Sequence, residues 1–253
     1  MLHKLWYTLR HAPVKALADY HENRARQKIV AIPELYTLLQ TYIGASGSTG
    51  CEWRDYWALY TYVRTHKPKE ILECGTGVST VVLAYALAEN ESEGGAPGRI
   101  TSMEELPEYY ELAKQLFPQK FVRYVDLRLS PAVQDTYLFF TGVRYRDIPE
   151  RQYDFVFVDG PNYTVDRIAL FDLDYLYVLA RSQTPVGAMV DTRTSTCWVF
   201  HTLLPHKFRY NYVKKIGYVE PAVARDLPDT LHVVARAMGR HAFHRTPLRS
   251  YVE

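Results

Sequence analysis

Residues 69–80 read Lys69-Glu70-Ile71-Leu72-Glu73-Cys74-Gly75-Thr76-Gly77-Val78-Ser79-Thr80, and an apolar run, residues 81–87, follows. The order of a short apolar run, a glycine turn and a second apolar run predicts a strand, a tight turn and a helix. Because glycine has no Cβ, the turn lets a ligand approach the backbone, and the amides that begin the helix favour anionic groups. Glu73 falls at the strand end, where open α/β sheets bind ligands. The segment therefore predicts a cofactor site.

Two later apolar segments also end in a carboxylate. Residues 99–104 end in Glu104, and residues 153–159 end in Asp159. Because ligands of open α/β sheets bind at the carboxyl ends of the strands, we expect both side chains to lie at the same sheet edge as Glu73. For Glu104 alone, a solvated strand end is the alternative explanation. One shared edge for three acidic residues argues for a ligand site.

These three strand ends also distinguish between cofactors. A dinucleotide-binding motif would have a third small residue at Thr80 and an acidic residue about 20 positions further along. Thr80 is neither glycine nor alanine, and the next strand ends much later, at Glu104. The pattern instead resembles the class I S-adenosylmethionine-dependent methyltransferases, and within them the small O-methyltransferase group. The resemblance covers residues 69–193, about half of the chain.

The resemblance implies an α/β fold, namely a Rossmann-like, doubly wound, mostly parallel seven-stranded sheet with an antiparallel last strand, plus N-terminal helices. It divides the chain into a helical extension that serves as a cap or lid (1–66), an S-adenosylmethionine-binding methyltransferase domain (67–238) and a basic C-terminal tail (239–253). Hydrophobic periodicity predicts the remaining elements: helices in residues 1–28 with a break near Pro13, 32–43, 51–66, 107–117, 132–152, 165–180 and 198–204; strands in 121–129 and 186–191; and a closing hairpin of 208–218 and 230–237.

The resemblance also implies roles for the motif residues. The glycine backbone should meet the methionine part of the cofactor, Glu73 should orient the cofactor's amino group, and Glu104 should hold the ribose. Ser79 and Thr80 should hydrogen-bond at the start of the helix, with simple helix capping as the alternative. The expected cofactor-binding residues are Glu73, Gly75, Thr76, Gly77, Ser79, Thr80, Glu104 and Asp159.

Asp159 and Asp191 form the expected catalytic pair, because each ends a predicted strand and the two strands should be neighbours. In metal-dependent relatives such as catechol O-methyltransferase, these positions contribute magnesium ligands, so the resemblance implies Mg²⁺ at Asp159 and Asp191 as one hypothesis. Thr192 follows Asp191 where those relatives have asparagine, and Asn162 stands where they have a lysine. The other hypothesis is therefore a metal-free site with Asp159 as the base. Further base candidates are His201 and His206.

Composition limits the classes of function. The chain has 253 residues, of which 47% are hydrophobic, so we expect a folded core. Its net charge of +2 argues neither for nor against nucleic acid, and we expect no nucleic-acid partner. Its three cysteines are widely spaced and odd in number, which favours a reducing compartment. No apolar run reaches the ~20 residues of a membrane span, and the N-terminus lacks a signal-peptide core. We expect a cytoplasmic protein.

The ends of the chain and the acceptor leave alternatives open. The basic amphipathic segment 1–28 is compatible with peripheral membrane contact, with packing on the domain or with a homo-oligomer. The glycine-rich segment 44–50 is a linker or a lid. The expected partner is a small-molecule or saccharide acceptor with a reactive hydroxyl. The alternative class is a nucleotide-binding protein, either dehydrogenase-like or a non-catalytic partner-binding module.

Overall fold

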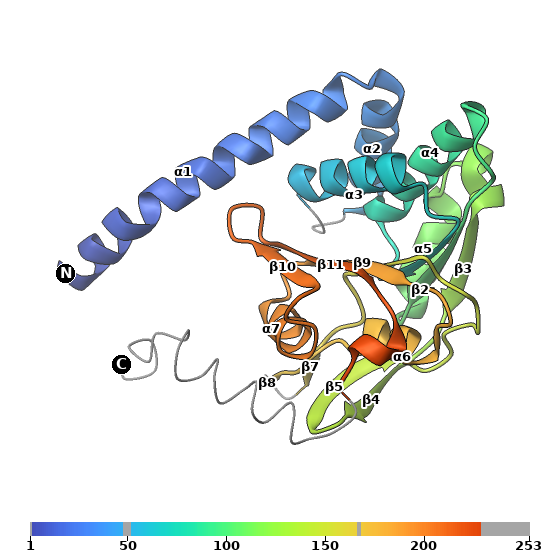
Figure 1. Cartoon of the computed structure of the whole chain (residues 1–253). Helices are drawn as coiled ribbons and strands as arrows, with labels where there is room; N and C mark the ends of the chain where they lie inside the picture. The colour runs from blue at the N-terminus through green and yellow to red at the C-terminus, as the bar shows by residue number, and fades with distance from the viewer. Residues whose placement is uncertain (1, 48–51, 166–167, 229–253) are drawn as a thin grey trace.

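A seven-stranded sheet forms the centre of the protein (Figure 1). The computed structural model describes residues 2–47, 52–165 and 168–228, with side chains described from residue 15 onward except those of residues 165, 168 and 169. The strands follow the order β10-β11-β9-β6-β1-β2-β3. Their bounds are β1 Glu70–Cys74, β2 Arg99–Glu104, β3 Val125–Leu129, β6 Phe155–Val158, β9 Val186–Asp191, β10 Phe208–Asn211 and β11 Ile216–Ala222.

The pairing of these strands confirms the predicted fold class. β1 pairs in parallel with β2 and β6, β2 pairs in parallel with β3, and β6 pairs in parallel with β9. β11 runs antiparallel to both β9 and β10. Strands that are covered on both faces read as continuous apolar runs, as β1 and β6 do. The sheet is therefore mostly parallel, and the antiparallel strand lies near its end.

Helices cover the two faces of the sheet. The face that carries Ile71 packs against α2 (Pro33–Ser46), α3 (Trp53–His66) and α4 (Val78–Ser92), and the C-terminal end of α1 (Leu2–Val30) adds Ile29 to this core. The opposite face, with Leu72, packs against α6 (Asp174–Arg181) and α7 (Thr194–Leu203). α5 (Pro107–Leu116) lies beside α2, β2 and β3. Alternate residues of one strand thus build two separate cores.

The long helix α1 differs from its prediction because it runs through Pro13 without a break. Figure 1 shows its N-terminal end extending away from the rest of the molecule. Ala25 and Ile29 are buried at the other end of the helix. None of the helices in the described part of the chain is long and apolar enough to cross a membrane.

Several predicted elements were wrong. A hairpin of β4 (Ala132–Tyr137) and β5 (Phe140–Tyr145) replaces the helix expected there, because its aromatic and β-branched residues favour strands and pair across the turn. The 3₁₀ helix η1 (Gln119–Tyr124) occupies the first half of the expected strand 121–129. The expected helix 165–180 is reduced to α6, and the short strands β7 (Thr164–Val165) and β8 (Ile168–Ala169) precede it.

The closing hairpin also differs from its prediction. β10 and β11 form it within residues 208–222, and the 3₁₀ helix η2 (Ala224–Asp226) follows. The expected partner strand 230–237, the tail 239–253 and residues 48–50 of the glycine-rich segment lie outside the described residues. The division of the chain into extension, domain and tail stays a prediction.

Candidate active site

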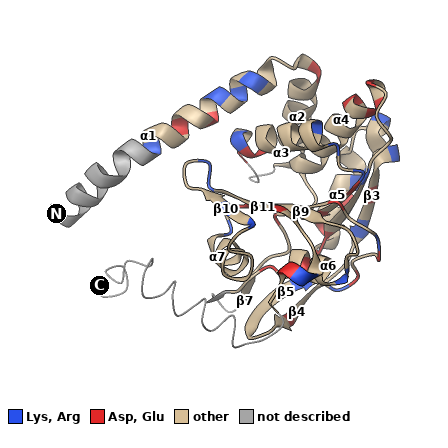
Figure 2. Ribbon diagram, in the orientation of Figure 1, with Lys and Arg blue, Asp and Glu red and all other residues tan. Residues whose placement is uncertain are grey.

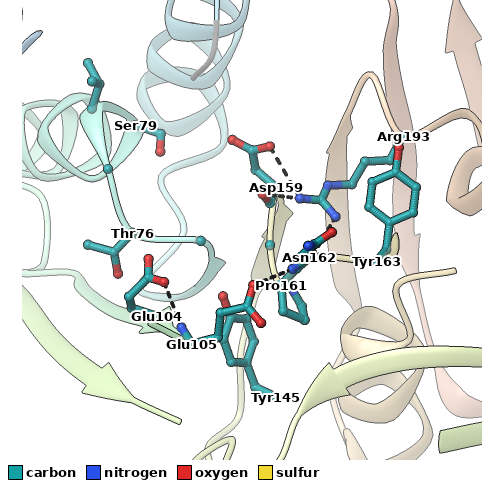
Figure 3. A pocket seen from close by; sticks show the side chains of 14 residues that line it. Thr76, Ser79, Glu104, Glu105, Tyr145, Asp159, Pro161, Asn162, Tyr163 and Arg193 are labelled. Atoms are coloured by element: carbon teal, nitrogen blue, oxygen red, sulfur yellow. Dashed lines mark hydrogen bonds and ion pairs between the residues drawn. The ribbon is translucent and has the colours of Figure 1, made fainter. Parts of the chain in front are cut away.

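A cavity of about 340 Å³ lies at the carboxyl edge of the sheet, where β1, β2 and β6 end and α4 begins (Figure 3). Its volume falls in the range of small-molecule sites, about 300–1,000 Å³. Figure 3 shows Glu104 and Thr76 on one side of the cavity and Asp159 and Arg193 on the other. The lining residues are Gly75, Thr76, Gly77, Val78, Ser79, Glu104, Glu105, Tyr145, Asp159, Gly160, Pro161, Asn162, Tyr163 and Arg193.

The two motif glycines do different things. Gly75 has φ +101°, and a Cβ there would lie 3.0 Å from the backbone C and O of Asp159. Its conformational freedom is needed for the close approach of two loops, and its contact with a cofactor stays a prediction. Gly77 has extended backbone, and a Cβ there would meet nothing within 4 Å. Gly77 also lines the cavity, and the open space beside its backbone leaves room for a ligand.

Glu73 and Thr80 lie outside the cavity lining. Glu73 is fully buried on the face covered by α4, and its Oε2 accepts hydrogen bonds of 2.6 Å from Ser102 Oγ and Thr80 Oγ1. Thr80 Oγ1 also accepts the Gly77 N–H at 3.0 Å, so Thr80 caps α4. Burial raises the pKa of Glu73 to about 7. Direct contact of either side chain with a cofactor stays a prediction.

The other motif side chains are on the cavity wall. Thr76 Oγ1 lies 2.8 Å from Ser102 Oγ and donates to the Met103 carbonyl at 3.2 Å, and Ser79 lines the cavity at the first turn of α4. Glu104 Oε1 accepts the backbone N–H groups of Glu105 and Leu106 at 2.9 and 3.0 Å. These bonds fix the Glu104 carboxylate at the cavity wall.

Arg193, which the sequence analysis missed, connects the far wall of the cavity. Its Nη1 donates to the Pro161 carbonyl at 2.8 Å and to Asp172 Oδ1 at 3.0 Å, while its Nη2 donates to the Asp159 carbonyl. The same Nη2 lies 3.8 Å from Asp159 Oδ1, and the guanidinium carbon lies 4.7 Å from the centre of the Tyr163 ring. Arg193 therefore holds Asp159 and the loop after it in place.

A second connection joins the two sides of the cavity. Glu105 Oε1 accepts the Asn162 backbone N–H at 2.6 Å, which ties the end of β2 to the loop after β6. Tyr145 of the β4–β5 hairpin also lines the cavity. The only sequence signal for Glu105 was its position directly after Glu104. Tyr145 had no such signal, because the hairpin was predicted as a helix.

The structure brings the expected catalytic pair together. Asp159 follows β6, Asp191 ends β9, and the two carboxyl groups are within hydrogen-bonding reach of each other. Asp159 lines the cavity, whereas Asp191 lies behind the lining and is mostly buried. Burial raises the pKa of Asp191. Burial, followed by the charge of Asp191, also raises the pKa of the neighbouring Asp55 on α3 to about 8. Among the histidines, neither His201 nor His206 lines the cavity.

Among the described residues, no third His, Cys, Asp or Glu side chain joins the two carboxylates of this pair. Within residues 15–47, 52–164 and 170–228, no three or more His, Cys, Asp and Glu side chains are grouped to hold a metal ion. Mg²⁺ prefers near-ideal octahedral oxygen coordination, but the guanidinium of Arg193 already supplies positive charge beside Asp159. The magnesium hypothesis for Asp159 and Asp191 stays a prediction, and no chemical step is derived through a metal.

The cavity does fit S-adenosylmethionine. Glu104, Glu105 and Asp159 give it three carboxylates against the single guanidinium of Arg193, and this balance favours a cofactor with a sulfonium and an ammonium group. A fixed carboxylate at Glu104 suits ribose hydroxyls, and the open space at Gly77 admits a ligand against the backbone.

The fold and the cavity together define a class of protein. It is an α/β protein with a small-molecule site at the carboxyl edge of a doubly wound sheet. A family model described as methyltransferase domain matches residues 72–186. This part of the chain is therefore similar to methyltransferase domains, in agreement with the resemblance drawn from the sequence. The match favours this class over a dehydrogenase-like protein. No curated protein matches the sequence.

Solved structures of methyltransferases show a distant similarity. A methyltransferase from Geobacter sulfurreducens is 13% identical, with a TM-score of 0.46 over 74% of this chain and 90% of its own. An O-methyltransferase from Bacillus cereus, in complex with S-adenosylhomocysteine, is 13% identical, with a TM-score of 0.46 over 77% and 96%. A methyltransferase from Podospora anserina bound to S-adenosylhomocysteine is 16% identical, with a TM-score of 0.40 over 88% and 73%. Similarity at this level says nothing about the reaction of this chain.

Proposed function

We propose that this protein binds S-adenosylmethionine in the cavity and methylates a hydroxyl oxygen of a small-molecule or saccharide acceptor. The observation that carries the proposal is the arrangement of the cavity, with Glu104 on one side and Asp159 on the other (Figure 3), Gly77 in the lining and Asp191 behind it. The bound cofactor supplies an electrophilic methyl group on a positively charged sulfur. The protein supplies position, electrostatics and a proton acceptor.

The two walls of the cavity divide these tasks. Glu104 Oε2 accepts from the ribose hydroxyls, and the three lining carboxylates attract the positively charged methionine part. Arg193 holds Asp159 in place through the carbonyls of Asp159 and Pro161. A rigid wall matters because methyl transfer needs the acceptor oxygen in line with the methyl group, and small misplacements are costly.

The carboxyl pair favours a hydroxyl acceptor. A hydroxyl must lose its proton as it attacks, so a base within reach of the acceptor accelerates the reaction. Asp159 lines the cavity and is the base, and Asp191 behind it can share the proton because the two carboxyl groups are within hydrogen-bonding reach. Two neighbouring carboxylates disfavour a second negative charge, which makes the pair a better proton acceptor than an isolated carboxylate.

The experiment is calorimetric titration of the folded protein with S-adenosylhomocysteine and, as the comparison, with NAD. Binding of S-adenosylhomocysteine without binding of NAD supports the proposed cofactor. A folded sample that binds neither compound, or NAD alone, overturns it. An acceptor screen with methyl-labelled S-adenosylmethionine then tests the reaction, and label found on nitrogen or carbon in place of oxygen would contradict the proposed acceptor atom.

A further inference from the structure

A second cavity, of about 270 Å³, lies between α1, α3 and the turn that joins β10 to β11. Figure 2 shows Lys and Arg on α1, at the start of α3 and at the tip of the hairpin. We call this cavity the basic cavity. Its lining residues are His21, Arg24, Ala25, Lys28, Arg54, Trp57 and Lys214.

The charge of the basic cavity is one-sided. Four of its seven lining residues are Lys or Arg, one is histidine, and none is acidic. Within the described side chains, no carboxylate forms an ion pair with Arg24, Lys28 or Lys214. The nearby Glu22 carboxylate accepts the backbone N–H groups of Trp53 and Arg54 at 2.7 and 3.2 Å, so it is engaged at the start of α3. The positive charge in the cavity is therefore largely uncompensated.

Arg54 is the residue that indicates a ligand. Its exposed fraction is 5%, its Nη2 pairs with Glu52, and its Nε has no hydrogen-bond partner among the described residues. A buried donor without a partner costs about 1–3 kcal/mol, and more when the group is charged. An anion in the basic cavity would be attracted by the charge of this guanidinium and by three further cations, Arg24, Lys28 and Lys214. Trp57, with Lys28 Nζ 4.9 Å from its ring centre, gives the cavity one flat apolar wall.

We propose that the basic cavity binds a phosphate group carried by a ligand. Guanidinium groups match the geometry of phosphate oxygens, and clustered Lys and Arg raise the local concentration of anions. The site is distinct from the cofactor cavity, with which it shares no lining residue. Arg54 nevertheless precedes Asp55, whose pKa responds to Asp191, so the two sites are neighbours. The proposal does not depend on methyl transfer.

The phosphate can come from a soluble phosphorylated compound or from an anionic lipid headgroup, and the test separates the two. Calorimetry with inorganic pyrophosphate at low salt probes the soluble source. Cosedimentation with phosphatidylcholine vesicles, with and without phosphatidylglycerol, probes the headgroup. Binding of pyrophosphate without vesicle binding assigns a soluble ligand, and binding only to phosphatidylglycerol vesicles assigns a membrane surface. If the protein binds neither pyrophosphate nor the vesicles, the proposal is overturned.

Variants test whether the basic cavity itself is responsible. Arg24→Gln and Lys214→Gln should each weaken binding by about tenfold, the scale of one charge-assisted hydrogen bond. Arg26→Gln and Lys215→Gln are the matched controls, because these neighbours lie on the same helix and hairpin but do not line the cavity. Equal losses in the lining and control variants would show diffuse surface attraction and would overturn the site. Unchanged thermal unfolding of all four variants confirms that they are folded, and this control does not depend on the cofactor proposal.

Discussion

Arg193 donates hydrogen bonds from Nη1 to both carboxylate oxygens of Asp172, at 3.0 and 3.2 Å, and Asp172 is fully buried. Thr196 Oγ1 adds a hydrogen bond of 2.8 Å to the same carboxylate. Burial nevertheless raises the pKa of Asp172 to about 6, which Arg193 and Thr196 only partly oppose. The Arg193–Asp172 ion pair thus stabilises the loop that follows β6 and contains Asp159, and the pair requires both charges.

Replacing Arg193 with glutamine should destabilise the protein more at pH 8 than at pH 5. At pH 8 the buried Asp172 carboxylate is left without its cation, a loss of about 3–5 kcal/mol. At pH 5 it is protonated in the folded state, because loss of Arg193 raises its pKa further above about 6. Urea unfolding at the two pH values measures the difference.

The control for this experiment is Arg209→Gln. Arg209 pairs with Glu220 at 2.6 Å, but both side chains are exposed, at 78% and 46%. An exposed pair contributes at most about 1 kcal/mol, so this variant should lose little stability, and equally at both pH values. If Arg193→Gln behaves in the same way, Arg193 does not have the supporting role assigned to it.

The two motif glycines should give opposite results on substitution. Gly77→Val should leave the protein folded and abolish binding of S-adenosylhomocysteine, because the new side chain enters open space beside the cavity. Gly75→Ala should instead lower the free energy of unfolding by about 1–3 kcal/mol, since φ +101° and the 3.0 Å contacts with Asp159 strain any side chain. Calorimetry and thermal unfolding distinguish the two effects. Loss of binding in Gly75→Ala at full stability would contradict this division.

The buried strands and the sheet edge could be predicted from sequence because each central strand reads as an apolar run that ends in a carboxylate. The alternation of side chains along β1 decides whether Glu73 faces the cavity, a question that the sequence alone left open. Glu73 shares the face of Ile71 under α4, where Ser102 of β2 is its neighbour in register, so it lies outside the cavity. Glu104, at the end of β2, reaches the cavity.

Other parts could not be predicted because they depend on tertiary contacts. Arg193 and Asp172 are 21 residues apart and meet only once α7 and the segment before α6 have packed. The segment of β4 and β5 carries aromatics at spacings that suit a helix or a strand, and cross-strand pairing, such as Tyr137 with Phe140, decides between them. Whether such a segment forms a helix or a strand depends on the residues elsewhere in the chain that pack against it.

Glu73 should make stability depend on pH. Its pKa is raised from 4.5 to about 7 in the folded protein, so the folded state binds the proton more tightly. Stability from this group is fully present below pH 4.5 and is lost as the pH rises through about 7, in total about 3 kcal/mol. Glu73→Gln should remove this decline, measured by urea unfolding from pH 4.5 to 8. The control variant Glu111→Gln changes an exposed side chain and should keep this decline in stability with pH. The same decline in Glu73→Gln would contradict the assignment of the pH dependence to Glu73.

Glu104→Ala should weaken the binding of S-adenosylhomocysteine by about 1–3 kcal/mol, the cost of losing hydrogen bonds to a charged group. The carboxylate is held by two backbone N–H groups at the cavity wall, so its removal takes away a fixed acceptor. Glu111→Ala, exposed on the neighbouring helix α5, is the control and should bind as the wild type does. Calorimetric dissociation constants give the comparison, and equal affinity for both variants would remove Glu104 from the cofactor site.

Methyl transfer should continue in EDTA once an acceptor has been found. Arg193 already places positive charge 3.8 Å from Asp159 Oδ1, and the part of the chain that the structure describes holds no group of three or more His, Cys, Asp or Glu side chains for a metal ion. Asp159→Asn should lower kcat by about 10²–10⁴-fold, the usual contribution of a general base. Asp191→Asn should cost less, because Asp191 lies behind the lining and acts through Asp159. Asp135→Asn is the control and should leave kcat unchanged, because Asp135 lies on the β4–β5 hairpin outside the cavity lining. Loss of activity in EDTA, rescue by Mg²⁺ and equal failure of both variants would instead establish a metal held by the two aspartates.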